Sequence, residues 1–157
     1  MNLTLTQLSD FLKKAKKNTY ASEQATKVPP LRPGSKDYEF TECNLTYHDT
    51  YFGGRWFIGQ EVVYENDIPI WGMGYNGYVT DPNLTEADID KSLRAALQQD
   101  TGHLIPVRGP AKFEVDDLTY ENKIAGPGLE RFEGQEKIVR ETYKNVYYCV
   151  YHGGLIE

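Results

Sequence analysis

The chain has 157 residues, of which 39% are hydrophobic and 13% aromatic, and its formal net charge is -6. This length corresponds to about one domain, and the apolar content is enough to bury a core, which excludes wholesale disorder. The negative charge opposes nonspecific binding to phosphate backbones, so we predict no nucleic-acid partner for this chain alone.

The N-terminal segment has no apolar region of the kind found in export signals. No stretch of the chain approaches the roughly 18 consecutive apolar residues of a membrane span. We therefore predict a cytoplasmic protein that makes no membrane contact.

A first helix is predicted directly after Thr4. The Thr4 hydroxyl can cap the helix while Gln7 reaches back to it, and Leu3 can pack on Leu8. Apolar residues then recur at helical spacing, which predicts a helix lying on a sheet. From residue 18 to residue 35 this periodicity vanishes, and the prolines there favour an extended connection.

Strands are predicted next, in the order 37–40, 44–51, 55–64 and 68–79, with Asp49 on the same face as Tyr47 and Tyr51. The strand 55–64 is apolar on both faces, which predicts a central position. The segment 72–77 matches the dinucleotide fingerprint GxGxxG, but strand residues follow its last glycine where a helix is required. We therefore predict no cofactor.

The second half of the sequence repeats the order of the first. Thr85 and Asp88 form another capping box, and a second proline-rich loop and a final hairpin, predicted to turn at Lys144-Asn145, follow. Two sets of segments recur in order: Leu45-Thr46-Tyr47 as Leu118-Thr119-Tyr120, and Phe57-Ile58-Gly59-Gln60-Glu61 as Phe132-Glu133-Gly134-Gln135-Glu136. We predict one α+β domain, residues 1–157, formed by a tandem duplication of a helix plus antiparallel-strand unit. The two repeats, about 1–80 and 81–157, would pack about a pseudo-two-fold axis.

No catalytic or metal-binding motif is present. The three histidines lack metal-ligand spacing, and no GxSxG, P-loop or HExxH sequence occurs, so we predict neither a metal nor catalytic residues. The recurring glutamates Glu61 and Glu136 remain, and they have two interpretations. Each either pairs with a neighbouring Arg, Lys or Tyr inside the sheet, or lies in an aromatic cleft as a partly desolvated anion.

In the second interpretation the cleft opens between the repeats and binds a small molecule, which would be cationic or aromatic. Aromatic side chains on the neighbouring strands would stack on it, and the arginines of the two proline loops would pair with the glutamates or with an anion. The candidate ligand-binding residues are Glu61, Glu136, Trp71, Tyr75, Tyr147, Tyr151, Arg32 and Arg108.

The segments Tyr47–Gly54, Phe57–Glu61 and Trp71–Tyr75, with the loop 30–35 and the closing Tyr151–Gly154, resemble an uncharacterised bacterial domain family of unknown function. Members of that family also occur behind XRE-type helix-turn-helix segments, which implies a sensor or interaction module. The duplicated architecture is also similar to the effector-binding domains of drug-responsive regulators, in which a buried Glu lies among aromatic residues.

Two other functions remain open. One is an enzyme that uses a cleft glutamate as general acid or base together with a tyrosine. The other is a protein-interaction module that exposes a tyrosine-rich sheet face. The sequence predicts neither the identity of the ligand nor the oligomeric state.

Overall fold

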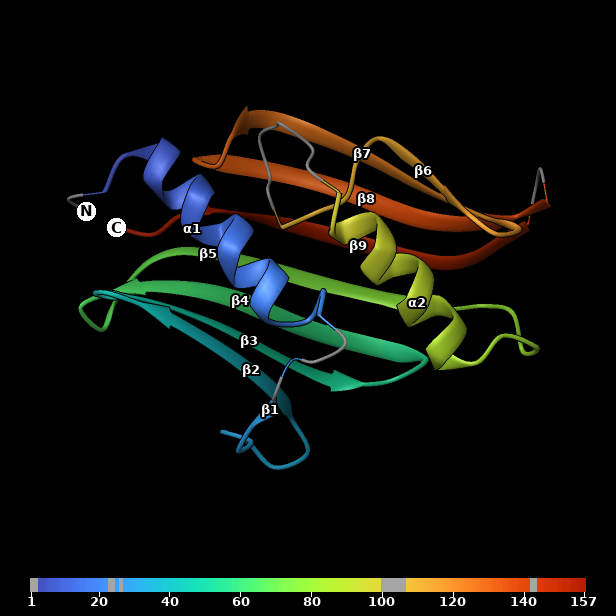
Figure 1. Cartoon of the computed structure of the whole chain (residues 1–157), viewed down its shortest axis with the longest axis horizontal. Helices are drawn as coiled ribbons and strands as arrows, with labels where there is room; N and C mark the ends of the chain where they lie inside the picture. Colours follow the sequence, from blue (N-terminus) through green and yellow to red (C-terminus); the bar gives the residue numbers. More distant parts are fainter. Residues whose placement is uncertain (1–2, 23–24, 26, 100–106, 142–143) are drawn as a thin grey trace.

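Figure 1 shows a computed structural model of the chain, which describes residues 3–22, 25, 27–99, 107–141 and 144–157. This part of the chain contains two helices and nine strands: five strands follow the first helix and four follow the second. In chain order they are α1 (Leu5–Asn18), β1 (Lys27–Val28), β2 (Lys36–Glu42), β3 (Leu45–Gly53), β4 (Trp56–Glu65), β5 (Ile68–Val79), α2 (Glu86–Leu97), β6 (Lys112–Val115), β7 (Leu118–Gly128), β8 (Arg131–Arg140) and β9 (Lys144–Leu155).

The strands form one antiparallel sheet in the order β1-β2-β3-β4-β5-β9-β8-β7-β6. The strands that follow α1 make one half of it and the strands that follow α2 make the other. The halves meet where β5 pairs with β9, and Tyr75 is the cross-strand partner of Tyr151. The predicted α+β class with antiparallel strands is confirmed. The glycines of the segment 72–77 lie within β5, as the strand prediction required.

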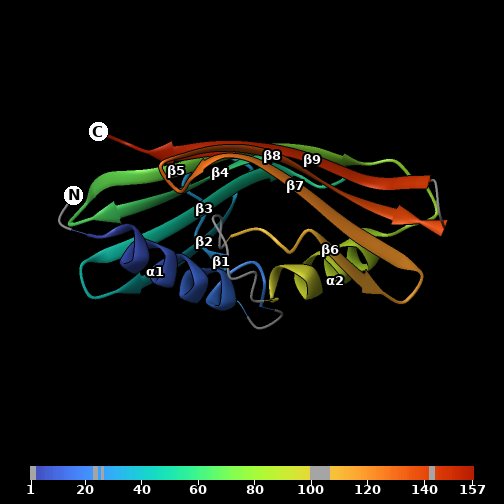
Figure 2. The same cartoon turned by 90° about the horizontal axis from the view of Figure 1, so that it is seen from above.

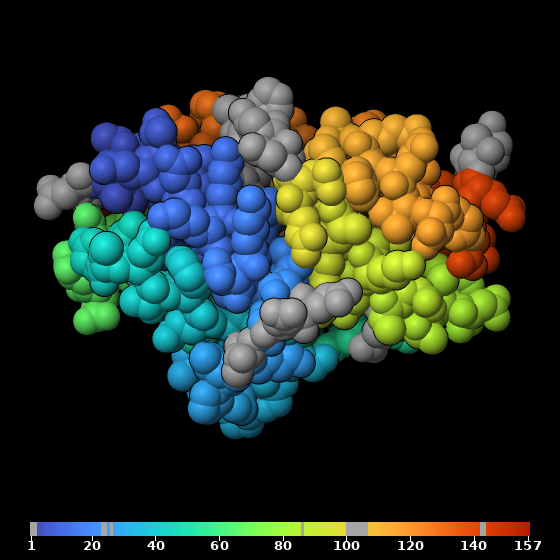
Figure 3. All heavy atoms as spheres, in the orientation of Figure 1, coloured from blue at the N-terminus to red at the C-terminus, as the bar shows by residue number. Residues whose placement is uncertain are grey.

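Both helices cover the same face of the sheet (Figure 2). The predicted capping boxes are confirmed: the Thr4 hydroxyl accepts the backbone N–H of Gln7, and the Thr85 hydroxyl accepts that of Asp88. Each helix turns its apolar stripe toward the sheet, because burying that stripe is what stabilises a short helix. Figure 3 shows the side chains of α1 and α2 spread over this face. Neither helix is long and apolar enough to span a membrane, as far as the chain is described.

The second capping box provides a direct test of the helix assignment. Thr85→Ala should lower the free energy of unfolding by about 1 kcal/mol, because the first turn of α2 loses the acceptor for its free N–H groups. Thr85→Ser, which keeps the hydroxyl, should stay near the wild type. Urea denaturation measures both variants, and equal stability of the two would contradict the capping role.

The face of the sheet opposite the helices is open. Strand β4 is paired on both edges, which confirms its predicted central position. Its outer face is not buried, however: Trp56 is 72% and Ile58 61% exposed, because neither helix lies on that side. The last hairpin also differs from its prediction. Lys144 and Asn145 are paired with Arg140 and Val139, so they lie within the paired strands and not at the turn.

Candidate functional site

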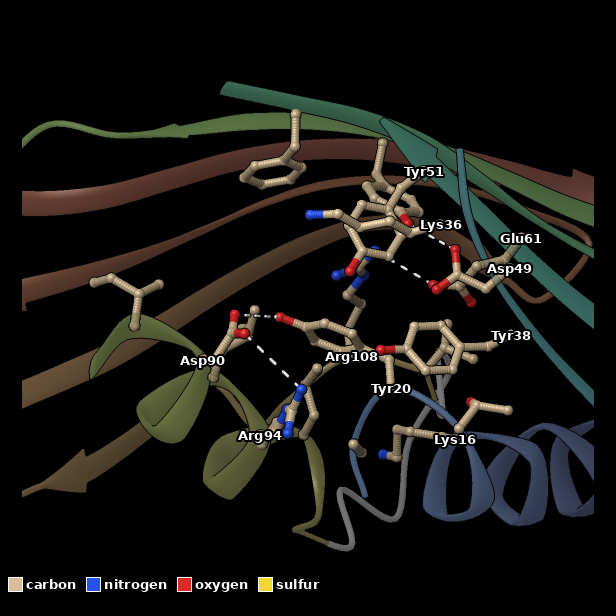
Figure 4. Close-up of a pocket in the computed structure, with 18 of the residues that line it drawn as sticks. Lys16, Tyr20, Lys36, Tyr38, Asp49, Tyr51, Glu61, Asp90, Arg94 and Arg108 are labelled. Carbon is tan, nitrogen blue, oxygen red and sulfur yellow. Dashed lines mark hydrogen bonds and ion pairs between the residues drawn. The ribbon is translucent and has the colours of Figure 1, made fainter. Parts of the chain in front are cut away.

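A cavity of about 240 Å³ lies between the two helices and the covered face of the sheet (Figure 4). Aromatic rings make up much of its wall, and carboxyl groups and a guanidinium lie among them. The lining residues discussed below are Lys16, Tyr20, Lys27, Lys36, Tyr38, Tyr47, Asp49, Tyr51, Phe57, Glu61, Tyr75, Asp90, Arg94, Arg108 and Tyr147. Both halves of the sequence contribute to it.

Glycine in the middle of β4 lets an aromatic ring cross the strand. Gly59 is the cross-strand partner of Tyr75, and a Cβ at Gly59 would lie only 2.5 Å from the Tyr75 ring. The ring therefore lies over the glycine, and the Tyr75 hydroxyl donates to Asp49 Oδ1 at 2.6 Å. Gly59 thus has a positional reason to be glycine, because no side chain fits where the ring passes.

The same arrangement occurs in the other half of the sheet. Gly134 is the partner of Tyr151, and a Cβ there would lie 2.4 Å from the Tyr151 ring. The Tyr151 hydroxyl donates to Asn122 Oδ1 at 2.6 Å. The two networks differ in chemistry: the first ends on a carboxyl group, Asp49, and the second on an amide, Asn122.

Two carboxyl groups face each other at the floor of the cavity. Asp49 on β3 is the cross-strand partner of Glu61 on β4, and both side chains are buried. Burial raises the pKa of Glu61 to about 7 against the lowering effect of the nearby Arg108 guanidinium. Burial, followed by the charge of Glu61, raises the pKa of Asp49 well above its ordinary value.

Glu61 is incompletely paired. Its Oε1 lies 3.6 Å from Arg108 Nη2, which is an ion pair without hydrogen-bond geometry. Its Oε2 is buried and has no hydrogen-bond partner among the described residues, although the nearby Tyr47 hydroxyl helps to lower the pKa of the carboxyl group. A buried carboxylate oxygen without a donor carries an uncompensated desolvation cost, so this atom is suited to accept a hydrogen bond from a bound molecule.

Glu136 has a different environment. It is fully buried beneath Tyr147, and its oxygens accept hydrogen bonds from Tyr120 at 2.6 Å, Tyr147 at 2.9 Å and Arg108 at 3.1 Å. Arg108 itself lies over the rings of Tyr75 and Tyr151, 5.3 and 5.0 Å from their centroids. Glu136 therefore acts as a structural anchor for Arg108.

The structure brings four of the predicted site residues to the wall of the cavity: Glu61, Tyr75, Tyr147 and Arg108.

The other four predicted residues lie elsewhere. Glu136 is behind the wall, and Tyr151 is in the core against Arg108. Trp71 is also in the core, where its Nε1 donates to the Leu129 carbonyl at 3.2 Å. Arg32 lies in an exposed loop before β2 and lines a different pocket, together with His48 and Gln60.

Sequence reasoning missed several lining residues. Asp49 had a usable signal: it stands at the same distance after Leu45-Thr46-Tyr47 as Asn122 after Leu118-Thr119-Tyr120, so an acid replaces an amide. Tyr38 and Tyr51 were placed on strands but not at a site. Tyr20 follows α1 in the stretch without periodicity, where no pattern indicates which way a side chain points.

Tyr20 links the two helices across the cavity. Its hydroxyl donates to Asp90 Oδ1 on α2 at 2.8 Å, and the Arg94 guanidinium lies 5.4 Å from its ring centroid. Tyr20 also packs edge-on against Tyr38 and Tyr51, whose rings are stacked on each other.

Among the described residues, no group of three or more His, Cys, Asp or Glu side chains is placed to hold a metal ion.

These features define an α+β protein whose antiparallel sheet carries two helices on one face, with a polar and aromatic cavity beneath them. The chain belongs to the family described as "Domain of unknown function (DUF5680)", whose model matches residues 49–156. The predicted resemblance to a domain family of unknown function is thereby confirmed. No curated protein and no solved structure gave a significant match to the chain.

Proposed function

We propose that this protein is a small-molecule-binding domain whose site is the cavity beneath the helices. The observation that carries the proposal is the unpaired Oε2 of Glu61, a buried acceptor in a cavity of about 240 Å³. Small-molecule sites are usually concave and lined by apolar and aromatic side chains, with a few polar groups that converge on the ligand. The ligand would donate a hydrogen bond or carry a positive charge at this point.

The charge balance of the floor supports a cationic ligand. Asp49, Glu61 and Glu136 surround one guanidinium, that of Arg108, which makes its hydrogen bond to Glu136. Lys16 is a second buried cation of the lining and acts more weakly on Glu61. With Glu136 ionised as well, three carboxylates would face two cations, and either a proton or a ligand cation would restore balance. The rings of Tyr75, Tyr147 and Phe57 line the cavity, and aromatic walls suit an organic cation or an aromatic group.

The paired networks also support the proposed tandem duplication about a pseudo-two-fold axis. A duplication would place Tyr75 opposite Tyr151 in an antiparallel pair, and these residues are cross-strand partners. It would also give each half a tyrosine crossing a glycine, which is the arrangement at Gly59 and Gly134. In this proposal the first half has become the ligand-binding half, and Asp49 marks the difference.

A sensor-like role follows from the proposed binding. We also propose a bacterial origin, an association with XRE-type segments and a cytoplasmic location. In such a role the ligand would bridge α1 and α2, since both helices contribute to the cavity wall. A change in how the helices pack would then report that the site is occupied.

The proposal is tested by a thermal-shift screen of organic cations and neutral aromatic compounds. A ligand at a hundredfold excess over its dissociation constant should stabilise the wild type by about 2.7 kcal/mol. Glu61→Gln keeps the shape of the side chain but removes its charge, so cationic hits should be lost in this variant. Glu133→Gln, an exposed glutamate of β8, is the matched control and should keep every hit.

Loss of the hits in both variants would indicate an effect unrelated to the cavity. A screen that stabilises neither the wild type nor the control would contradict the proposed function.

A further inference from the structure

Acidic and basic side chains lie at different ends of the cavity. Asp49 and Glu61 form the buried acidic floor. Lys27 is exposed and Lys36 half-buried, and both line the cavity at its open side; Lys36 Nζ also donates to the Gly53 carbonyl at 2.9 Å and keeps its charge. Lys36 Nζ lies 5.2 Å from the centroid of the Tyr51 ring, and Lys27 Nζ lies 6.0 Å from that of Tyr38. The stacked rings of Tyr38 and Tyr51 therefore lie next to the lysines, and Tyr38 is also the cross-strand partner of Asp49.

The strand register fixes the separation of these ends. Lys36 is the cross-strand partner of Tyr51, and the next pair on the same face of β2 and β3 is Tyr38 with Asp49. Successive pairs on one face are two residues apart, which is about 7 Å along a strand. Lys36 and Asp49 are therefore about one aromatic ring apart, and Lys27 lies on the other side of Tyr38, on β1.

Asp90 is the carboxylate on the α2 side of the opening. It accepts a hydrogen bond from Tyr20 and lies 3.9 Å from the Arg94 guanidinium, so its charge is offset locally. Lys27 and Lys36 thus leave the open end of the cavity positive, while at its floor the three carboxyl groups of Asp49, Glu61 and Glu136 outnumber the two cations Arg108 and Lys16. A bound molecule that matches both ends needs a positive group inside and a negative group at the opening.

We propose that the ligand of this cavity is a small aromatic zwitterion, with a protonated amine directed to Glu61 and Asp49 and an anionic group directed to Lys27 and Lys36. This inference rests on the proposed function and specifies the chemical class of the ligand. Its ring lies among the tyrosines, which would hold the two charged groups at opposite ends.

Three matched probes test the inference: benzylamine carries only the amine, 4-methylbenzoate only the carboxylate, and 4-(aminomethyl)benzoate both groups on opposite sides of one ring. Isothermal titration calorimetry at pH 7.5 measures the affinity of each probe for the whole chain. We expect 4-(aminomethyl)benzoate to bind about fivefold tighter than benzylamine, because a half-exposed lysine adds a modest attraction. 4-Methylbenzoate should bind weakest.

The double variant Lys27→Gln, Lys36→Gln removes the basic end. It should abolish the advantage of 4-(aminomethyl)benzoate and leave the affinity for benzylamine unchanged. Lys112→Gln, an exposed lysine of β6 that does not line the cavity, is the control and should preserve the advantage. Circular dichroism melts verify that all variants remain folded.

The outcomes separate the two proposals. Equal affinity for benzylamine and 4-(aminomethyl)benzoate, with no effect of the lysine substitutions, would overturn the zwitterion and leave the cationic site intact. Binding of 4-methylbenzoate alone would overturn it as well, and would assign the cavity to anions. Binding of none of the three probes, together with a negative thermal-shift screen, would overturn both proposals.

Discussion

Replacing Arg108 by methionine is expected to lower the free energy of unfolding by about 3 to 5 kcal/mol. Arg108 is buried, donates to Glu136 and lies beside Glu61, so its removal leaves two buried carboxyl groups without their cation. Methionine has a similar length and fills the space between the Tyr75 and Tyr151 rings. The loss therefore measures the charge and its hydrogen bonds, and not a cavity. Urea denaturation at pH 7.5 gives the value.

Arg32→Met is the matched control, because Arg32 occupies the corresponding position of the first proline-rich loop and is exposed. Its effect should remain within about 0.5 kcal/mol. A loss below about 1 kcal/mol for Arg108→Met would indicate that the carboxyl groups accept protons or water in place of the guanidinium, and would contradict its role as their common partner.

Raising the pH from 4.5 to about 7 is expected to destabilise the protein by about 3 kcal/mol, chiefly through the buried Glu61 carboxyl group, which titrates together with its neighbour Asp49. The folded state holds the Glu61 proton up to a pKa of about 7, whereas the unfolded chain releases it near 4.5. Since the folded state binds more protons in this window, its stability is greatest below the window and falls as pH rises through it. Unfolding in urea at a series of pH values measures the slope.

Glu61→Gln should flatten this dependence, because the amide does not titrate. The charged or titratable groups around Glu61 are Asp49, Arg108, Tyr47, Glu136 and Lys16. Burial also raises the pKa of Asp49, so a smaller slope of the same sign should persist in the variant. Parallel pH profiles for wild type and Glu61→Gln would exclude a titrating Glu61.

Another buried carboxyl group acts in the opposite direction but outside this window. Burial would raise the pKa of Asp37, but hydrogen bonds from Ser35, Thr50 and His48 outweigh it and lower the pKa to about 2. Its contribution to stability is complete above its ordinary value of 3.8 and is lost only as pH falls toward 2. The slope between pH 4.5 and 7 therefore reports on the floor of the cavity.

Patterns of residues close in sequence were sufficient to predict where the helices begin and which residues share a strand face. The capping boxes at Thr4 and Thr85 and the alternation that places Tyr47, Asp49 and Tyr51 on one face depend on residues close in sequence, and the structure contains them as predicted. Gly59 and Gly134 also recur in matching segments of the sequence. The structure supplies the physical reason, which is a tyrosine ring lying across each glycine.

The residues that line the cavity could not be predicted in the same way. Glu61 and Glu136 occur in the same sequence context, yet Glu136 is fully hydrogen-bonded and Glu61 has an unpaired oxygen. That difference depends on Arg108 turning inward while Arg32 remains exposed, which no local pattern encodes. Tyr20 reaches the cavity only because the chain after α1 crosses toward Asp90.

The sequence by itself determined where the helices begin, the faces of the strands and the recurring glycine and glutamate positions, because these follow from hydrogen bonding and side-chain periodicity over a few residues. Only the tertiary structure decided that both helices lie on one face, that a cavity remains between them, and which carboxyl groups in it lack partners. These properties depend on contacts between segments distant in sequence, because burial and the position of Arg108 determine the charge of each carboxyl group.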